Sequence, residues 1–538
     1  MKRCPKCDRL FEENLLKFCR TDGTLLLSSL SDDVDTVILP VAPVAHPSKS
    51  DLSQTFSIAV IPFTNLTTDP ANEYYCVGLA DELVRAFSRI EKLQVTAPTS
   101  SFGFRGKGVS VPEIGRVLNI EAVLEGTIRR SKDEMRITVQ LVSAQTGFQL
   151  WSERYERQTS DTFSLISEIA LAVVNALDLP LSEAEQFAIS KRQTENSTAH
   201  QLYLRGRFHL SRITAERLRA GVEDLKNAIA EDPNYALAYA GLAEAYYLGT
   251  GVHQPPSESL TLVKEAAEKA LELDENLAEA EALLAIVAAN YERKPQEAER
   301  RIQRALKLAP HSLLAHRWYG CFLMTQGRLA AAIAELCRAR ELDPLSPNVS
   351  VLISHTYVFA RQPHKALKHA RRAMSLADNF WLAYWSAALA YEQLGQLVEA
   401  LDQLEKTAER DTSPWILASR ARVYAKLGRR EVAELLLKEL DEHASNRWVP
   451  PYLIATVYFA LDDHDRAFEW LQKAYDQYDD TLNYLAVCPL MDPYRSDRRF
   501  IDLLRHTRLD QSNAMTHFVV PVYVDGLSSG RLFGSSSL

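Results

Sequence analysis

Apolar and polar residues follow two different patterns along this chain. Residues 58–63 form a short apolar run, and Ile137, Val139 and Leu141 alternate with polar neighbours, which is typical of strands with a buried face. Between such strands, residues 78–90 carry apolar positions at helical spacing. The first pattern therefore predicts an α/β domain with a mixed sheet over residues 56–180.

Beyond residue 198 the apolar spacing is helical, and one phrase recurs at a nearly constant distance. The residues that close this phrase are Asp232, Asp274, Ala309, Asp343, Ala377 and Asp411. The distances between them are 42, 35, 34, 34 and 34 residues. Small residues recur at a second position, where two helices must approach closely: Ala228, Ala270, Ala305, Ala339 and Ala373. A helical hairpin exposes an apolar face until neighbouring hairpins stack on it. The second pattern therefore predicts an all-α solenoid of about eight helical hairpins over residues 198–508. The first distance, 42 residues, is longer than the others, and we expect its additional residues to form a loop at residues 249–257. A closing helix is expected within residues 489–505.

A period of 34 residues is that of the tetratricopeptide repeat. The consensus of this repeat has a Leu-Gly pair, small residues at fixed positions and a terminal proline. In one unit of this chain, Tyr319 and Gly320 stand at the Leu-Gly pair, Ala332 and Ala339 at the small positions, and Pro344 at the proline. This part of the chain resembles a tetratricopeptide-repeat protein. The resemblance implies a right-handed arch whose first helices line a concave surface.

The α/β region carries a second resemblance. Its phrases IAVIPFTNLTTDPANEYYCVGLADELVRAFSRI, TSSFGFRGK, AVLEGTIRR and TGFQLWSERYER look like the TolB-type amino-terminal domain that precedes tetratricopeptide repeats in bacteria. In that family the TolB-type domain and its repeats are commonly attached to a nucleotide cyclase, a winged-helix transcription regulator or a protein kinase. The stretches left over in this sequence are too short for any of these, so we expect none of them here.

Three cysteines crowd the start of the chain. Cys4 and Cys7 form a Cys-x-x-Cys turn, and Cys19 and Asp22 repeat its spacing with an aspartate in the fourth place. The pattern resembles a short bacterial zinc ribbon over residues 1–28 and predicts a structural zinc site of these four residues. A degenerate ribbon that binds metal poorly and a redox-active Cys-x-x-Cys are the alternatives. Elsewhere the cysteines are expected to be small buried apolar residues: Cys76, Cys321, Cys337 and Cys488.

Three further segments lack regular spacing. Residues 29–55 mix Ser, Asp and Pro and are typical of a flexible linker, and residues 181–197 are expected to connect the α/β domain to the solenoid. Residues 509–538 end in Ser and Gly and are expected to form a loose tail, although HFVVPVYV could add a strand.

Composition restricts the class of protein. The chain has 538 residues, of which 46% are hydrophobic and 24% charged, as in ordinary soluble globular proteins. A net charge of −9 disfavours nonspecific binding to nucleic acid, which depends on clustered Lys and Arg. Because the sequence lacks a long apolar run and an apolar leader, we expect a bacterial cytoplasmic protein without a membrane span.

One loop invites an enzymatic interpretation. Residues 101–108 hold three glycines and a lysine, but their spacing differs from that of a phosphate-binding loop, so the loop is interpreted as a structural turn. Arg105 and Lys107 could still meet an anionic ligand. No catalytic constellation was recognised, and the sequence predicts a protein that is not an enzyme.

A partner of the solenoid is expected on its concave surface. The positions that map to this surface are Tyr247, Asn290, Arg317, His355, Trp385, Glu392, Arg422 and Tyr452. Aromatic and arginine side chains dominate binding hot spots, which favours Trp385, Tyr452 and Arg317. An equally weighted alternative is that Trp385 only packs between adjacent hairpins.

Two functional hypotheses follow. The leading one is a non-enzymatic scaffold that binds a protein or peptide in the solenoid groove. The alternative is a signal-transduction or transcription regulator, related to cyclase- or winged-helix-linked repeat proteins, in which the ribbon is the output or contacts DNA. The ribbon is only slightly basic, so a nucleic-acid partner is the weaker expectation.

Overall fold

The computed structural model describes residues 55–67, 72–131, 134–158, 164–210, 215–249, 256–408, 413–444, 448–507 and 509. It also assigns three short strands near the start, β1 (Lys2–Arg3), β2 (Leu10–Phe11) and β3 (Leu27–Ser28), paired antiparallel in the order β2-β1-β3. The four expected zinc ligands, most of the linker at 29–55 and residues 510–538 lie outside the described residues.

The α/β domain is built on one mixed sheet in the order β6-β4-β7-β8-β9. Its strands are β4 (Phe56–Val60), β5 (Thr64–Asn65), β6 (Leu93–Thr96), β7 (Ala122–Arg130), β8 (Glu134–Ser143) and β9 (Gln149–Gln158). Strand β4 lies parallel to both β6 and β7, whereas β7, β8 and β9 are antiparallel neighbours. The mixed sheet predicted from the sequence is therefore present.

Helices cover both faces of this sheet near β4. The side chains of Ile58 and Val60 pack under α1 (Glu73–Ser88) and α4 (Leu165–Ala176), while Ala59 points to α3 (Val111–Leu118) on the other face. Two short elements follow β6, namely α2 (Pro98–Ser101) and the 3-10 helix η2 (Phe102–Phe104). The expected connection at 181–197 contains a helix, α5 (Glu183–Ser190).

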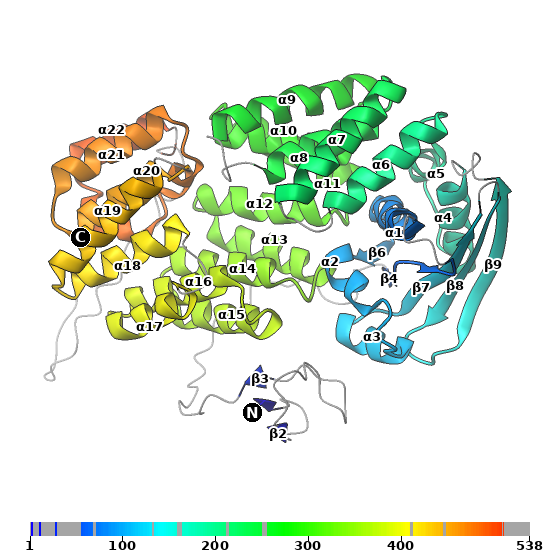
Figure 1. Cartoon of the computed structure of the whole chain (residues 1–538), viewed down its shortest axis with the longest axis horizontal. Helices are drawn as coiled ribbons and strands as arrows, with labels where there is room; N and C mark the ends of the chain where they lie inside the picture. The colour runs from blue at the N-terminus through cyan, green and yellow to red at the C-terminus, as the bar shows by residue number, and fades with distance from the viewer. Residues whose placement is uncertain are drawn as a thin grey trace, which may run out of the picture.

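The described helices from α6 to α21 pair into eight hairpins that stack from the α/β domain toward the C-terminal end (Figure 1). The hairpins are α6 (Ser197–Leu210) with α7 (Ala215–Glu231), α8 (Ala236–Leu248) with α9 (Pro256–Leu273), α10 (Ala278–Asn290) with α11 (Pro295–Leu308), α12 (Leu313–Thr325) with α13 (Leu329–Leu342), α14 (Pro347–Phe359) with α15 (Pro363–Leu376), α16 (Trp381–Gln393) with α17 (Leu397–Ala408), α18 (Pro414–Lys426) with α19 (Arg430–Ala444), and α20 (Pro451–Ala460) with α21 (His464–Asp476). A final helix, α22 (Arg498–His506), follows them and overlaps the second half of the segment 489–505, where a closing helix was expected. The predicted solenoid is confirmed.

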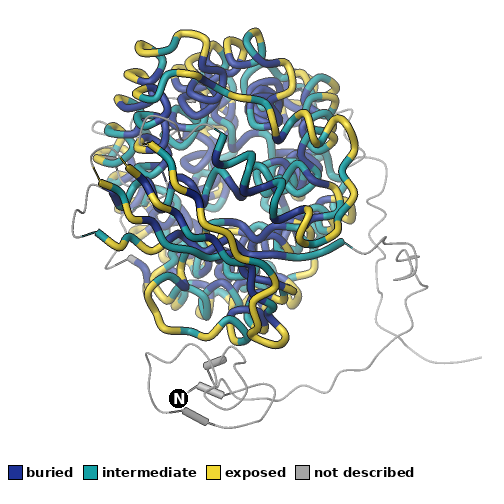
Figure 2. Tube along the Cα trace, turned by 90° about the vertical axis from the view of Figure 1, so that its right-hand side faces the viewer, coloured by how far each residue is buried: buried dark blue, intermediate teal, exposed yellow. Residues whose placement is uncertain are grey.

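Small residues allow the two helices of each hairpin to touch. The alanines at the second fixed position have no exposed surface: Ala228, Ala270, Ala305, Ala339 and Ala373. At Gly320, an added Cβ would lie 2.6 Å from Cγ of Leu336. The buried residues run through the interior of the stacked helices, and the exposed ones gather on the outer turns (Figure 2).

The C-terminal end of the solenoid folds back onto earlier hairpins. After α21, the 3-10 helices η3 (Asp480–Tyr484) and η4 (Pro489–Tyr494) reach the turns that end α10 and α14. Asn483 donates a hydrogen bond to Asn290 over 3.1 Å, and Arg361 donates to the Val487 carbonyl over 2.8 Å. The ring centroids of Tyr484 and Phe359 lie 5.5 Å apart. We call η3, η4 and the residues between them the closure segment, residues 480–494, because it covers part of the surface that the sequence indicated as an open groove.

Candidate functional site

The eight residues expected on the concave surface all lie on first helices of hairpins, from α8 to α20. The structure divides them into three groups with different environments. One group is buried in joints between hairpins, one forms a half-buried aromatic cluster, and one lies at or beside a pocket under the closure segment.

Glu392 and Arg422 form a buried joint between α16 and α18. The Arg422 guanidinium donates two hydrogen bonds of 2.9 Å to the Glu392 carboxylate, and the Lys426 ammonium lies 2.8 Å from it. Burial alone would raise the pKa of Glu392, but Arg422 and Lys426 outweigh it and lower this pKa to about 2. The sequence placed Glu392 and Arg422 on the open surface, whereas the structure uses them to hold adjacent hairpins together.

Tyr452 is buried as well. Only 7% of it is exposed, its hydroxyl donates to the Cys488 sulfur over 3.2 Å, and burial raises its pKa. The residues that follow α21 cover it. Tyr452 was expected to be a hot spot, and the structure instead makes it part of the core of the last hairpin.

Trp385 belongs to a half-buried aromatic cluster that spans three consecutive first helices. Its ring lies 4.9 Å from His355 on α14, 6.4 Å from Trp381 on the same helix and 5.1 Å from Trp415 on α18. Its Nε1 donates to Ser419 Oγ over 2.9 Å. We call Trp381, Trp385, Trp415 and His355 the tryptophan cluster. Trp385 thus packs between hairpins and also keeps exposed surface, so both interpretations of this residue hold in part.

His355 carries an unsatisfied nitrogen within this cluster. Its Nε2 is buried and has no hydrogen-bond partner among the described residues. Burial lowers the pKa of His355 to about 4, so the imidazole is neutral at pH 7.

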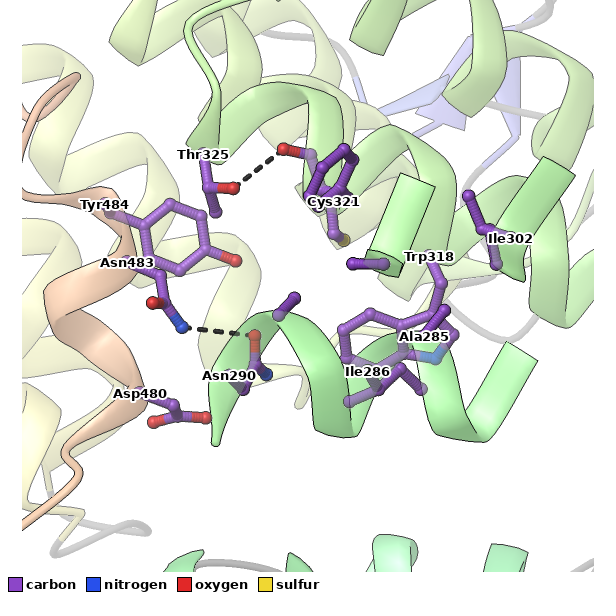
Figure 3. Close-up of a pocket in the computed structure, with 13 residues that line it drawn as sticks. Ala285, Ile286, Asn290, Ile302, Trp318, Cys321, Thr325, Asp480, Asn483 and Tyr484 are labelled. Atoms are coloured by element: carbon purple, nitrogen blue, oxygen red, sulfur yellow. Dashed lines mark hydrogen bonds between the residues drawn. The ribbon is translucent and has the colours of Figure 1, made fainter. Parts of the chain in front are cut away.

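A pocket of about 80 Å³ lies between the closure segment and the third and fourth hairpins (Figure 3). We call it the closure pocket. Its lining residues are Ala285, Ile286, Ala289, Asn290, Ala298, Ile302, Trp318, Cys321, Phe322, Thr325, Asp480, Asn483 and Tyr484. Asp480, Asn483 and Tyr484 stand on one side in Figure 3, and Trp318 with Ile286 stands on the other. Of the expected groove residues, only Asn290 lines this pocket.

Tyr247 and Arg317 lie beside the closure pocket. The Tyr247 ring packs edge-on against Trp318 with centroids 5.1 Å apart, and burial raises the pKa of its hydroxyl. The Arg317 guanidinium lies 6.0 Å from the Trp318 ring centroid and makes no ion pair with a described residue. Arg317 is therefore the one expected groove residue that offers a charge not already paired within the described chain.

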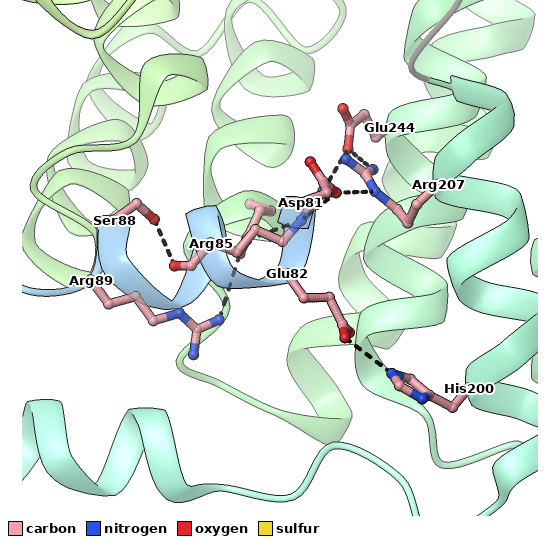
Figure 4. Close-up of polar contacts among 9 residues, drawn as sticks. Asp81, Glu82, Arg85, Ser88, Arg89, His200, Arg207 and Glu244 are labelled. Carbon is pink, nitrogen blue, oxygen red and sulfur yellow. Dashed lines mark hydrogen bonds and ion pairs between the residues drawn. The ribbon is translucent and has the colours of Figure 1, made fainter. Parts of the chain in front are cut away.

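The α/β domain docks on the solenoid through a partly buried group of ion pairs (Figure 4). Arg207 of α6 contacts Asp81 of α1 over 3.2 Å and also pairs with Glu244 of α8. Arg85 of α1 reaches Glu279 of α10 over 3.2 Å. Burial alone would raise the pKa of Asp81, but Arg85 and Arg207 together lower it. Sequence reasoning missed this group because its members are up to 198 residues apart in the chain and carry no spacing signal.

The turns between successive hairpins form the rest of this docking edge. Thr194 donates to Asp232 over 2.5 Å, and the Lys191 ammonium lies 2.8 Å from Asp274. Ser100 donates to Asp343 over 2.5 Å. These aspartates are among the residues that mark the sequence period, so the period also repeats the contact points for the α/β domain and the connection that follows it.

A second cavity, of about 840 Å³, lies at the carboxyl ends of β4 and β6. Strands β6 and β7 leave β4 on opposite sides there, which is where open α/β sheets usually bind ligands. Helices α6 and α8 contribute Arg207 and Glu244 to its wall. Arg105 also lines it but forms an ion pair with Glu73, and the loop around it turns at Gly106 and Gly108 with φ of 69° and 63°. The glycine-rich loop is thus a turn, as expected.

Within the described residues, no cluster of three or more His, Cys, Asp or Glu side chains is arranged to hold a metal ion. None of the described helices combines the length and apolar character that crossing a membrane requires. The expected zinc ligands lie outside the part of the chain to which the first statement applies.

A family model described as a tetratricopeptide repeat matches residues 283–347 and 352–414. The solenoid contains tetratricopeptide repeats. The matched residues cover the hairpins from α10 to α17, where the steps between phrases are most regular.

Two curated proteins are similar to parts of the chain. It is 33% identical over 187 residues to "Putative adenylate cyclase 3" of Rhizobium meliloti (strain 1021), which covers 35% of this chain and 32% of that protein. It is 24% identical over 255 residues to the transcriptional regulator HilA of Salmonella paratyphi A (strain ATCC 9150 / SARB42), which covers 47% of this chain and 40% of that protein. The chain therefore spans well under half the length of these relatives.

Solved structures with similar hairpins include Pseudomonas aeruginosa pilF, with 22% identity and a TM-score of 0.32 over 39% of this chain and 92% of that chain. Another is a human IFIT1 dimer with m7Gppp-AAAA, with 14% identity and a TM-score of 0.41 over 59% of this chain and 78% of that chain.

Proposed function

We propose that this chain is a non-enzymatic scaffold whose tetratricopeptide solenoid binds a protein or peptide at the tryptophan cluster. The observation that carries the proposal is the set of half-buried aromatic rings on three consecutive first helices, α14, α16 and α18. Such rings bury large apolar areas at little cost in conformational entropy, which is why they dominate binding hot spots. The buried joint of Glu392 and Arg422 beside the cluster keeps the rings in a fixed arrangement.

The other parts of the proposal rest on residue types alone. We propose that the chain works in the bacterial cytoplasm and that its α/β domain is of the TolB type. We also propose that a structural zinc ion is held by Cys4, Cys7, Cys19 and Asp22. Zinc analysis of the purified chain, with Cys4→Ser and Cys7→Ser as the comparison, tests that site separately from the solenoid.

Peptide selection tests the solenoid proposal. A phage library of random dodecapeptides is selected on the full chain, and the Kd of each recovered peptide is measured by fluorescence polarisation. Trp385→Ala should weaken these peptides by about tenfold or more, because it removes the ring at the centre of the cluster. Trp385→Phe, which keeps an aromatic ring but loses the bond to Ser419, should weaken them less.

Trp470→Ala is the matched control, because Trp470 lies on the second helix of its hairpin and outside the tryptophan cluster. It should leave the Kd unchanged, and circular dichroism should show that all three variants fold. Failure to recover any peptide, or equal affinity of the wild type and Trp385→Ala, would overturn the proposal.

A ligand-responsive regulator is the second candidate. The cavity at the carboxyl ends of β4 and β6 favours it, because its walls come from both the α/β domain and the solenoid, so that a ligand there would contact both. The names of the two curated relatives, a cyclase and a transcriptional regulator, agree with this class. A gel shift of duplex DNA by the full chain at low salt tests the nucleic-acid form of this candidate, and absence of any shift removes that form.

A further inference from the structure

We propose that the closure pocket binds an alkylammonium group, as carried by a lysine side chain of the partner. This inference rests on the proposed function and names the partner's chemistry at one point of the same surface. It is carried by the carboxylate of Asp480, by the aromatic walls of the pocket, and by the contacts that link these walls to the tryptophan cluster through α14.

Asp480 supplies a negative charge that nothing in the described chain neutralises. Its carboxylate lines the pocket, is half-buried, and has no Lys, Arg or His nitrogen within 4.0 Å among the described residues. Burial raises the pKa of Asp480, and only the backbone N–H groups of Asp480 and Thr481 act against this rise. A cation placed in the pocket would relieve the unfavourable burial of this charge.

The neighbouring carboxylate increases the negative potential. Asp479 is 3% exposed and accepts hydrogen bonds from the Tyr452 and Thr481 backbone N–H groups. Burial and the charge of Asp480 raise the pKa of Asp479 to about 7. No Lys, Arg or His nitrogen of the described residues lies within 4.0 Å of either carboxylate, and an ammonium group would relieve the repulsion between the two charges.

The walls suit the rest of a lysine side chain. Trp318, Phe322 and Tyr484 present aromatic surface, and ring faces attract cations as well as methylene groups. Ile286 and several alanines complete an apolar channel, while Asn290 and Asn483 offer amide oxygens. A volume of about 80 Å³ can hold the end of a lysine side chain.

The pocket is linked to the tryptophan cluster through side chains of α14. Tyr484 of the pocket stacks on Phe359 of α14, with ring centroids 5.5 Å apart. His355 lies one helical turn before Phe359 and contacts Trp385 over 4.9 Å. Helix α14 therefore carries, four residues apart, a ring that contacts the pocket and a member of the tryptophan cluster.

Two probes test the inference. The first is n-butylammonium, which reproduces the end of a lysine side chain, with 1-butanol as its neutral counterpart. Saturation-transfer NMR on the full chain should show saturable binding of the ammonium and none of the alcohol. Asp480→Asn should abolish this binding without loss of folding, because it removes a charge that burial already disfavours.

The second probe is the set of selected dodecapeptides. Those that bind the wild type should contain lysine, and replacing that lysine by norleucine should weaken them by about tenfold or more, as should Asp480→Asn. Asp476→Asn is the matched control, since Asp476 is exposed on α21 and outside the pocket, and it should change neither probe.

The outcomes separate the two proposals. Peptides that need Trp385 but bind equally well without lysine, or to Asp480→Asn, would overturn the lysine site and leave the scaffold intact. Binding of n-butylammonium that depends on Asp480, in the absence of any selected peptide, would support the cation site and count against the scaffold. Absence of ammonium binding to the wild type would overturn the inference.

Discussion

Single residues in this chain are constrained mainly by close contact and by charge burial. Gly320 and the buried alanines hold helices together because a larger side chain has no space there. Glu392 and Arg422 satisfy each other in a place where either charge alone would be costly. The period revealed the small residues, but it did not reveal the partner of either charge, because the two residues lie in different hairpins.

We expect acid to weaken the joint around Glu392. Its pKa is about 2 in the folded chain, below the ordinary value of 4.5, so its stabilisation is complete above pH 4.5 and is lost as the pH falls toward 2. The resulting loss in the free energy of unfolding should amount to about 3 kcal/mol. Urea titrations at a series of pH values should show a steeper loss of unfolding free energy for the wild type than for Glu392→Gln. Parallel curves would contradict this expectation.

Gly320→Ala should destabilise the fourth hairpin. The new Cβ would lie 2.6 Å from Leu336 Cγ, and this overpacking outweighs the better helix propensity of alanine by about 1 to 2 kcal/mol. Chemical denaturation measures the loss. Gly103→Ala serves as the control, because its Cβ would meet only Lys107 Nζ at 4.0 Å, and it should unfold like the wild type.

At the scale of elements, the docking of the α/β domain depends on polar contacts between α1 and the first helices of three hairpins. Sequence patterns predicted both elements because strand and helix periods are local properties. They could not predict the docking, since Asp81 and Arg207 are brought together only when the hairpins stack. The helix α5 was missed because it is short and has few buried positions.

Arg207→Met should loosen this docking. It leaves Asp81 and Glu244 with the Arg85 guanidinium alone and should cost about 2 kcal/mol, less than leaving a buried charge without any partner. Hydrogen exchange should become faster in α1 and α6. Arg338→Met removes an exposed pair with Glu341 and should change stability by less than about 1 kcal/mol. Unchanged exchange in α1 would show that the packing of α1 against α6 alone holds the domain.

At the scale of the whole molecule, the solenoid is joined at two edges. The α/β domain and the connection that follows it contact turns between hairpins from the first to the fifth, and the closure segment contacts turns within the third and fifth hairpins. Residues at equivalent positions of different repeats therefore have different neighbours and different exposure to solvent. The surface left for a partner is set by these two contacts as much as by the repeats.

Arg361→Gly should open the closure. Arg361 pairs with Asp492 and bonds the Val487 carbonyl, and its φ of 55° suits glycine, so the substitution removes the side chain without straining the turn. Small-angle scattering should show a larger radius of gyration. Asp462→Gly, at a turn residue with φ of 63°, is the control and should leave the radius unchanged. An equal radius for both variants would mean that the other contacts of the closure segment suffice.

The sequence by itself determined the hairpins, their approximate number and the mixed sheet before them, because periodicity and small-residue spacing act within a few turns of chain. It also located the first helices on which the groove residues lie. Only the tertiary structure decided which of those residues stay exposed, since Glu392 and Arg422 are buried between hairpins and Tyr452 is buried under the residues that follow α21. The pocket at Asp480 exists for the same reason. Its two sides are about 190 residues apart and meet only when the end of the solenoid returns to its middle.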